Sequence, residues 1–163
     1  MNAREMLARV RELSGGKTVR VGILADKPKA AERGKHSKKA RVRAKVERRA
    51  RAAPSLLEVA IIHEFGGGRV PARSFIRATM DEKRAEIVAL QVHLAQQVLK
   101  GTMTPEQALN ALGAKVAAWC QARIVAGIAP PLAASTLRRK KRKTTPLILT
   151  GQLKSSITWA VAA

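Results

Sequence analysis

The stretch that decides the fold runs from Ser55 to Lys100 and reads SLLEVAIIHEFGGGRVPARSFIRATMDEKRAEIVALQVHLAQQVLK. Ser55 and Glu58 have the spacing of a capping box, in which two side chains bind backbone amides that would otherwise lack partners. The apolar positions that follow predict a short helix, which the three glycines 66–68 end. A proline comes next, and a long amphipathic helix is expected from about Arg73. A short helix, a glycine hinge and a long helix form a structural unit with no evident chemistry.

The chain continues with a second long helix. Thr104 and Gln107 repeat the capping-box pattern, and a proline occupies the first helical position between them. We expect this helix to end near Gly127, just before two consecutive prolines, and to pair with the first long helix as an antiparallel hairpin or to lie beside it across a sheet. The positions expected on the apolar faces are Ile76, Met80, Ile87, Leu90, Leu94 and Val98 in the first helix and Leu109, Leu112, Val116 and Trp119 in the second.

Two short stretches near the ends of the chain have the alternation of half-buried strands. In Thr18–Leu24, Val19, Val21 and Ile23 alternate with small or polar residues, and a weaker pattern covers Ile157–Val161. We expect these two strands to pair. Residues 2–13 are expected to form a short amphipathic helix.

Positive charge is the dominant compositional feature of the 163-residue chain, whose net charge is +21. Most of it is concentrated in an expected arm, residues 27–53, and a basic loop, residues 138–145, which together hold eighteen basic residues and two acids. Such charge favours nucleic acid or an acidic protein surface as the partner. The candidate contact residues are Lys27, Lys29, Arg33, Lys35, Lys38, Lys39, Arg41, Arg43, Lys45, Arg48, Arg49 and Arg51 in the arm, and Arg138, Arg139, Lys140, Lys141, Arg142 and Lys143 in the loop.

The arm has two interpretations that the sequence leaves open. It is either a solvated loop or a segment that contacts DNA phosphates or an acidic neighbour. Residues 40–53 alternate like a strand, yet their Ala and Arg content also suits a helix that orders on binding. Because aromatic residues make up only 2% of the chain, stacking on bases is not expected, and any nucleic-acid binding should be non-specific and sensitive to salt.

The patterns typical of enzymes and metal sites are incomplete. His63 and Glu64 begin an H-E-x-x-H motif, but Gly67 stands where the second histidine would be. The glycines 66–68 lack the ending of a phosphate-binding loop, and Cys120, the single cysteine, is expected to be a small buried residue. We therefore expect no enzyme, no metal and no cofactor. No apolar run approaches a membrane span and no signal core is evident, so a cytosolic product is expected.

Three segments together resemble a known family of tailed-bacteriophage neck proteins, called tail-completion, head–tail joining or virion morphogenesis proteins. Residues 60–66 (AIIHEFG) and 70–77 (VPARSFIR) are similar to that family's "HEFG … iPaRpFlR" signature. Residues 130–137 (PPLAASTL) resemble its "PPL…T" stretch, and residues 146–157 (PLILTGQLKSSI) its "PLidTGqLrxSi" ending. Order and spacing agree from Ser55 to the C-terminus. Ser74 stands where the family usually has proline, and Leu149 where an acidic residue is common.

The resemblance implies an α+β fold for a single domain, residues 1–163, with a small antiparallel sheet packed against a long helix and a second helix. It implies a structural virion protein that forms a ring at the head–tail interface, joins the tail to the connector and surrounds the DNA channel. The implied partners are further copies of the chain (six favoured, twelve possible), connector or stopper proteins, tail terminator or tail tube proteins, and double-stranded DNA.

The assembly residues that the resemblance implies are His63, Glu64, Phe65, Gly66, Pro71, Arg73, Phe75, Arg77, Thr150, Gly151 and Leu153. We expect the protein in the host cytoplasm during assembly and in the virion neck afterwards, without membrane contact. The alternative is a free, non-specific nucleic-acid-binding protein, such as a packaging or chaperone factor. That alternative explains the charge but not the three segments.

Overall fold

The structure, a computed structural model, describes residues 15–24, 55–139, 145–148 and 151–162, and the backbone at positions 4, 5, 8 and 11. The arm of residues 27–53 lies outside the described residues, as does most of the basic loop. The four N-terminal positions have helical backbone, in agreement with the helix expected there. None of the helices within these described ranges is long and apolar enough to cross a membrane.

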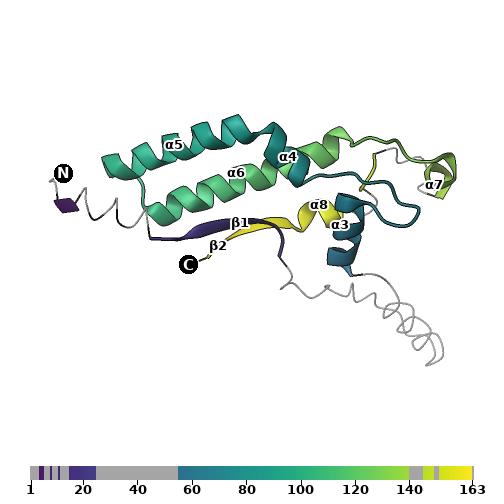
Figure 1. The fold of residues 1–163 in the computed structure, drawn as a ribbon, viewed down its shortest axis with the longest axis horizontal. Helices are drawn as coiled ribbons and strands as arrows, with labels where there is room; N and C mark the ends of the chain where they lie inside the picture. Colours follow the sequence, from purple (N-terminus) through teal and green to yellow (C-terminus); the bar gives the residue numbers. More distant parts are fainter. Residues whose placement is uncertain are drawn as a thin grey trace, which may run out of the picture.

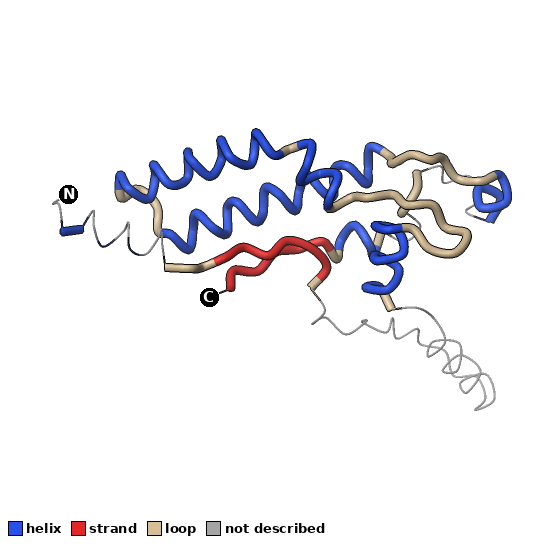
Figure 2. Tube along the Cα trace, in the orientation of Figure 1, coloured by secondary structure: helices blue, strands red, loops and turns tan. Residues whose placement is uncertain are grey.

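The centre of the molecule is a three-layer arrangement around one long helix. α6 (Pro105–Ala126) lies between α5 (Arg84–Lys100) on one side and a two-stranded sheet on the other (Figures 1 and 2). The predicted capping box of Thr104 and Gln107 begins α6, and Gly101 ends α5 in the left-handed conformation that favours glycine. Of the two expected arrangements, the hairpin is confirmed, and the two helices do not lie together across the sheet, because only α6 packs against it.

The sheet pairs the two predicted strands, which come from opposite ends of the chain. β1 (Thr18–Ile23) and β2 (Ile157–Ala162) run antiparallel, with Val21 opposite Trp159. Trp159 packs so closely on α6 that a Cβ at Gly113 would lie 2.5 Å from its ring. The helix and the strand can approach this closely because position 113 has no side chain. The α+β prediction is confirmed to this extent.

The main core joins α6, the sheet and the segment around α3 (Leu56–Phe65). Its fully buried side chains include Phe75, Cys120 and Ile124, and Val21, Ile23 and Trp159 pack against them. Cys120 is fully buried, as expected. A smaller cluster of Leu94, Val98 and Ala108 closes the far end of the α5–α6 hairpin.

α3 begins and ends as the sequence predicts. Ser55 Oγ accepts from the amide of Glu58 at 3.1 Å, and the Glu58 carboxylate accepts from the amide of Ser55 at 2.6 Å. Gly66 follows the last residue of α3 with φ of 80°, and a Cβ there would lie 3.1 Å from the backbone nitrogen of Ala72. The next residues form a closed turn in which Gly67 and Val70 exchange two backbone hydrogen bonds. The expected glycine hinge is therefore a tight turn.

The long helix expected from about Arg73 is different in the structure. Residues 71–76 are not helical, and the helix begins as the short α4 (Arg77–Glu82), with a break at Lys83 before α5. The late start has a clear cause, because the amides of Arg77 and Ala78, which would bond to the carbonyls of residues 73 and 74 in a helix from Arg73, donate to the side chains of Glu64 and Ser74 instead. The prediction of one continuous helix from Arg73 was wrong.

Two short helices complete the described fold. α7 (Ala134–Arg139) was not predicted, and it includes the first two residues of the expected basic loop. α8 (Gln152–Ser155) is a single helical turn that leads directly into β2.

Candidate functional site

The Glu64 carboxylate is the centre of the first family-like segment. Glu64 is 5% exposed, near the end of α3, and it accepts hydrogen bonds from four successive residues. These are the Ser74 hydroxyl at 2.6 Å, the amides of Phe75, Ile76 and Arg77 at 2.8, 3.1 and 2.9 Å, and the Arg77 Nε at 3.3 Å. Three of the donors are backbone amides: those of Phe75 and Ile76 precede α4 and that of Arg77 is the first of the helix, where amides have no partner within the helix. Glu64 therefore acts as the cap of α4 from a distant helix.

Ser74, at the position where the resembled family usually has proline, adds to this cap. Its hydroxyl donates to Glu64 and accepts from the amide of Ala78 at 3.0 Å. The carboxylate and the hydroxyl together satisfy the amides of residues 75–78. Ser74 thus supplies a hydrogen-bond partner that proline could not supply.

The hydrogen bonds also set the protonation state of Glu64. Burial alone would raise the pKa of this carboxyl, but the hydrogen bonds from Ser74 and from the amides of Arg77, Ile76 and Phe75 outweigh burial, so its pKa lies below the ordinary value. A carboxylate that is ionised and held by five donors is a poor general base. The arrangement fixes the backbone between α3 and α4.

Arg77 and Phe65 lie on the outer side of the same cluster. The Arg77 guanidinium donates to the Glu64 carbonyl at 3.0 Å and lies 4.2 Å from the centre of the Phe65 ring. Phe65 is 60% exposed, which is unusual for a residue of its size. Of the two aromatic residues in the segment, Phe75 is fully buried and Phe65 remains at the surface.

Arg73 connects the first family-like segment to the second. It is 5% exposed, and its Nε and Nη2 donate to the carbonyls of Pro130 and Pro131 at 2.9 and 3.2 Å. The two residues that accept are the prolines of the PPL stretch, fifty-seven and fifty-eight residues away in the chain. Arg73 thereby holds the loop after α6 against the loop after α3.

The third family-like segment joins the other two through the core. Leu153 and Ile157 are buried in the same cluster as Phe75, and Leu147 and Ile148 pack against it. Gly151 has φ of 83° just before α8, a conformation that favours glycine. Thr150 lies outside the described residues. The structure thus brings all three segments into one contiguous unit.

His63 occupies a different environment from its neighbour. Its Nδ1 is buried and has no hydrogen-bond partner among the described residues. Burial, and to a smaller extent the charge of Arg73, lowers the pKa of His63 below its ordinary value. The described residues include no group of three or more His, Cys, Asp or Glu placed to hold a metal ion. Burial raises the pKa of the Cys120 thiol, because it disfavours the charged thiolate there.

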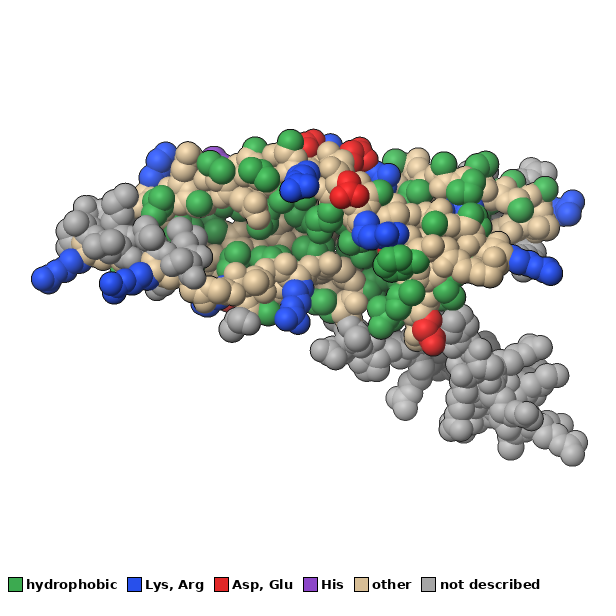
Figure 3. Space-filling view, in the orientation of Figure 1, with side chains coloured by type: hydrophobic (Ala, Val, Ile, Leu, Met, Phe, Trp, Pro, Cys, Tyr) green, Lys and Arg blue, Asp and Glu red, His purple; other side chains and the backbone are tan. Residues whose placement is uncertain are grey.

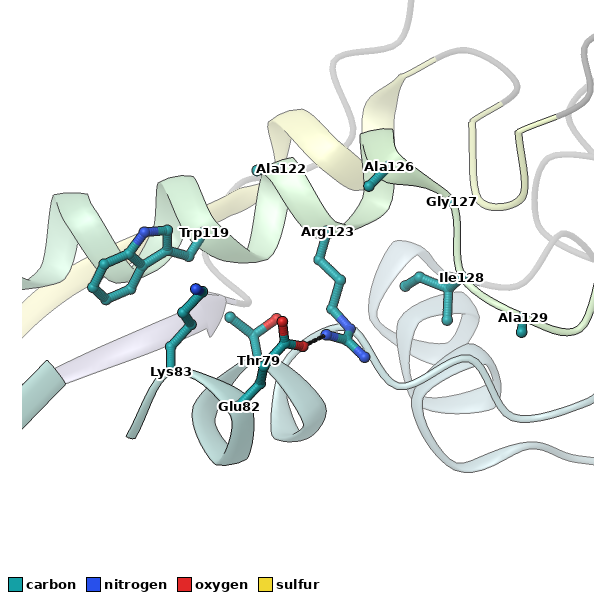
Figure 4. A pocket seen from close by; sticks show the side chains of 10 residues that line it. All are labelled: Thr79, Glu82, Lys83, Trp119, Ala122, Arg123, Ala126, Gly127, Ile128 and Ala129. Atoms are coloured by element: carbon teal, nitrogen blue, oxygen red, sulfur yellow. Dashed lines mark hydrogen bonds and ion pairs between the residues drawn. The ribbon is translucent and has the colours of Figure 1, made fainter. Parts of the chain in front are cut away.

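A cavity of about 510 Å³ lies between α4 and the last turns of α6 (Figure 4). Its walls carry the ion pair of Glu82 and Arg123 and the side chains of Trp119, Lys83 and Ile128. Arg123 also donates to the carbonyl of Ser74 at 3.3 Å. Both charged groups of the pair are therefore engaged within the protein.

The expected basic contacts are only partly described. Arg138 is exposed at the end of α7, and for Arg139 the helical backbone is described. The other expected contacts of the arm and the loop lie outside the described residues. Among the expected assembly residues, Gly66 is half-buried, Pro71 is exposed and Arg73 is buried.

Sequence reasoning missed two properties of this site. It did not foresee the buried position of Arg73, since its partners are backbone carbonyls more than fifty residues away. It also did not foresee that α3 leaves large apolar side chains in solvent, although a signal was present, because seven of its ten residues are apolar. No family model matches this sequence, and the searches of curated proteins and of solved structures return no match either.

Proposed function

We propose that this chain is a structural subunit of a tailed-phage neck, which forms a ring at the head–tail interface, joins the tail to the connector and surrounds the DNA channel. One observation carries the proposal. The three segments that resemble the neck family are distant in sequence, yet the fold joins them through Arg73 and the core around Phe75. Segments that contact one another form one structural signature, which is more specific than three separate short motifs.

The distribution of charge supports this role. The expected arm and basic loop hold eighteen of the thirty-two basic residues, and the rest of the chain holds nine of the eleven acids. A chain whose positive charge is concentrated in two segments suits a subunit that faces DNA or acidic neighbours in a channel. Phosphate contacts of this kind are electrostatic and independent of base sequence.

The chemistry of the described residues supports a structural role. The buried polar groups of the site hold backbone: Glu64 binds the amides that lead into α4, and Arg73 binds two carbonyls. We propose that six copies form the ring, with twelve as the other symmetry to test. The subunit would carry out no turnover.

The second candidate is a free, non-specific nucleic-acid-binding protein. The concentration of charge in two segments favours it, because such segments bind phosphates without a ring. This candidate predicts that the monomer coats DNA and has no assembly partner.

Two experiments separate the candidates. Deletion of the coding sequence from the phage or prophage that carries it should leave filled heads and finished tails that do not join, as seen by electron microscopy, and a plasmid copy should restore joining. Normal particles in the deletion would contradict the neck role.

Binding to a short DNA duplex, measured by fluorescence anisotropy across a salt series, tests the charged segments. We expect steep salt dependence, and replacement of Arg138–Lys143 by Asn should reduce the slope by about 0.9 for each phosphate that the loop no longer neutralises. A slope that is unchanged by this replacement would show that the loop does not bind DNA.

A further inference from the structure

His63 presents a buried polar atom that none of the described residues pairs. The residue is half-buried on α3, and its Nδ1 has no hydrogen-bond partner in the described part of the chain. Figure 3 shows hydrophobic side chains gathered over α3, and an apolar surrounding of this kind solvates a charge poorly. Protonation makes both ring nitrogens donors, so it would create a poorly solvated charge and a buried donor without an acceptor.

Arg73 is in direct contact with His63 and opposes its protonation. The amide of Arg73 donates to the carbonyl of His63 at 2.6 Å, which joins the two residues through their backbones. The Arg73 side chain is buried and permanently charged, and its charge lowers the pKa of His63 in addition to burial. A protonated His63 would place a second cation beside this buried one.

The carboxylates of α3 have structural partners of their own. Glu64 accepts from the amides of residues 75–77 and from the Arg77 side chain. Glu58 completes the capping box at the start of the helix. Both carboxylates are therefore committed to backbone groups near the two ends of α3.

The elements packed near the end of α3 bring cations or paired charges to this region. Arg123 on α6 is paired with Glu82 of α4, and α8 carries the cation Lys154. The loop of residues 127–133 has no ionisable side chain. Among the described groups, the charge that acts on the pKa of His63 is that of Arg73, and it acts against protonation.

Arg73 is also the connection that protonation of His63 would strain. Its Nε and Nη2 donate to the carbonyls of Pro130 and Pro131, and both prolines are exposed on the loop that follows α6. This loop leads directly into α7, where the expected basic loop begins. Because its residues 129–131 are at the surface and α3 contributes to the core, the loop is the side of the connection that is free to move.

We propose that His63 and Arg73 form an acid-sensitive latch between α3 and the loop of residues 127–133. While His63 is neutral, Arg73 holds the carbonyls of Pro130 and Pro131, and the latch is closed. When His63 takes up a proton, the two adjacent cations repel each other and Arg73 releases both carbonyls. The loop then separates from α3 while the rest of the core stays packed.

The size of the effect follows from proton linkage. The pKa of His63 is lowered in the closed form, and in the open form it returns toward its ordinary value of 6.5. The closed form is therefore fully stable above pH 6.5 and loses stability as the pH falls below that value. Between pH 7.5 and pH 5.5, a group that binds its proton in the open form alone raises the opening equilibrium by up to about 10-fold.

Hydrogen exchange of the Arg73 Nε proton, followed by NMR, reports the bond to Pro130 directly. We expect its protection, corrected for the intrinsic pH dependence of exchange, to fall by about 3- to 10-fold between pH 7.5 and pH 5.5 in the wild type. The fall should be less than about 2-fold in His63→Gln. His93→Gln, at an exposed position of α5, is the matched control and should follow the wild type. Equal falls in the wild type and in His63→Gln would overturn the latch.

The same exchange measured in low urea separates the latch from unfolding of the whole chain. Movement of a surface loop exposes little new surface, so the exchange of the Arg73 proton should change little between 0 and 1 M urea. Exchange through global unfolding rises steeply with urea. A pH response that carries the full urea dependence of global unfolding would show that no local latch exists.

A titration of the His63 ring, followed through its NMR resonances, keeps the test independent of the stability of His63→Gln. The midpoint should lie below 6.5 in the wild type. Arg73→Met removes the charge and both side-chain donors, so it should raise the midpoint. A wild-type midpoint at or above 6.5, or one that Arg73→Met leaves unchanged, would overturn the coupling of His63 to Arg73.

Discussion

At the scale of single residues, Glu64 makes more hydrogen bonds than any other side chain of the site. One carboxylate accepts from the Ser74 hydroxyl, from three amides and from the Arg77 guanidinium. A side chain that replaced it would leave buried amides without partners, which costs more than the net value of the bonds themselves. The cap accounts for the glutamate of the His63-Glu64 pair, which is part of the first segment that resembles the neck family.

We predict that Glu64→Gln lowers the free energy of unfolding by about 2–4 kcal/mol, since glutamine keeps one acceptor oxygen and turns an NH₂ group toward the remaining donors. Urea unfolding measures the change. Glu58→Gln is the matched control on the same helix, because glutamine also completes a capping box, and it should cost less than about 0.5 kcal/mol. Equal effects of the two substitutions would contradict the capping role of Glu64.

His63 gives a prediction about pH. Its pKa is lowered in the folded state by burial and by Arg73, so the unfolded chain binds a proton at a higher pH than the folded chain does. The stabilisation is present above the unfolded pKa, 6.5, and is lost as the pH falls below that value toward the folded pKa.

The measurement is urea unfolding between pH 7.5 and pH 5. The wild type should lose more stability over this range than His63→Gln, and His93→Gln, at an exposed position of α5, should follow the wild type. Identical pH profiles for the wild type and His63→Gln would show that His63 does not contribute.

Residue roles that depend on local spacing were predictable. The capping boxes of Ser55 and Thr104 and the glycine stops at 66 and 127 are confirmed, because each pattern involves only neighbours in the chain. The roles of Glu64 and Arg73 were not predictable, because their partners come from later segments.

At the scale of elements, the close approach of α6 and β2 determines how the sheet is held. A Cβ at Gly113 would lie 2.5, 2.6 and 2.9 Å from three carbons of Trp159. Gly113 is buried within α6, where glycine would otherwise weaken the helix. The cost of glycine in the helix is therefore offset by the packing of Trp159.

We predict that Gly113→Ala lowers the free energy of unfolding by about 1–3 kcal/mol, because the new methyl group overlaps the indole and one element must shift. Helix propensity alone predicts the opposite sign, a gain of up to about 1 kcal/mol. Thermal or urea unfolding decides between the two signs. A stabilised variant would contradict the close packing, and Ala118→Gly, at an exposed site of α6, serves as the control for propensity.

The elements themselves could be predicted better than their exact limits. Both strands, α3, α5 and α6 follow from hydrophobic periodicity, and the pairing of β1 with β2 is confirmed. The start of the long helix was wrong by about four residues, because the side chains of Glu64 and Ser74 bind the amides of Arg77 and Ala78. α7 was missed because its short sequence has no apolar periodicity.

At the scale of the whole molecule, charge and exposed apolar area are separated. The basic residues concentrate in the arm and the loop, and the described body exposes apolar side chains on α3 and α5. The sequence predicted the charged segments but not these exposed apolar side chains, because exposure depends on which side of each helix the core uses.

Ring formation is best tested by the mass of the nuclease-treated protein in light scattering at high salt, across a range of concentrations, with negative-stain images of any large species. High salt removes association through nucleic acid and leaves apolar contacts intact. We predict a closed ring of one stoichiometry, six copies or twelve, formed by the protein alone or on addition of tail tubes. A monomer at every concentration, with tail tubes present, that still coats DNA at low salt would contradict the neck role.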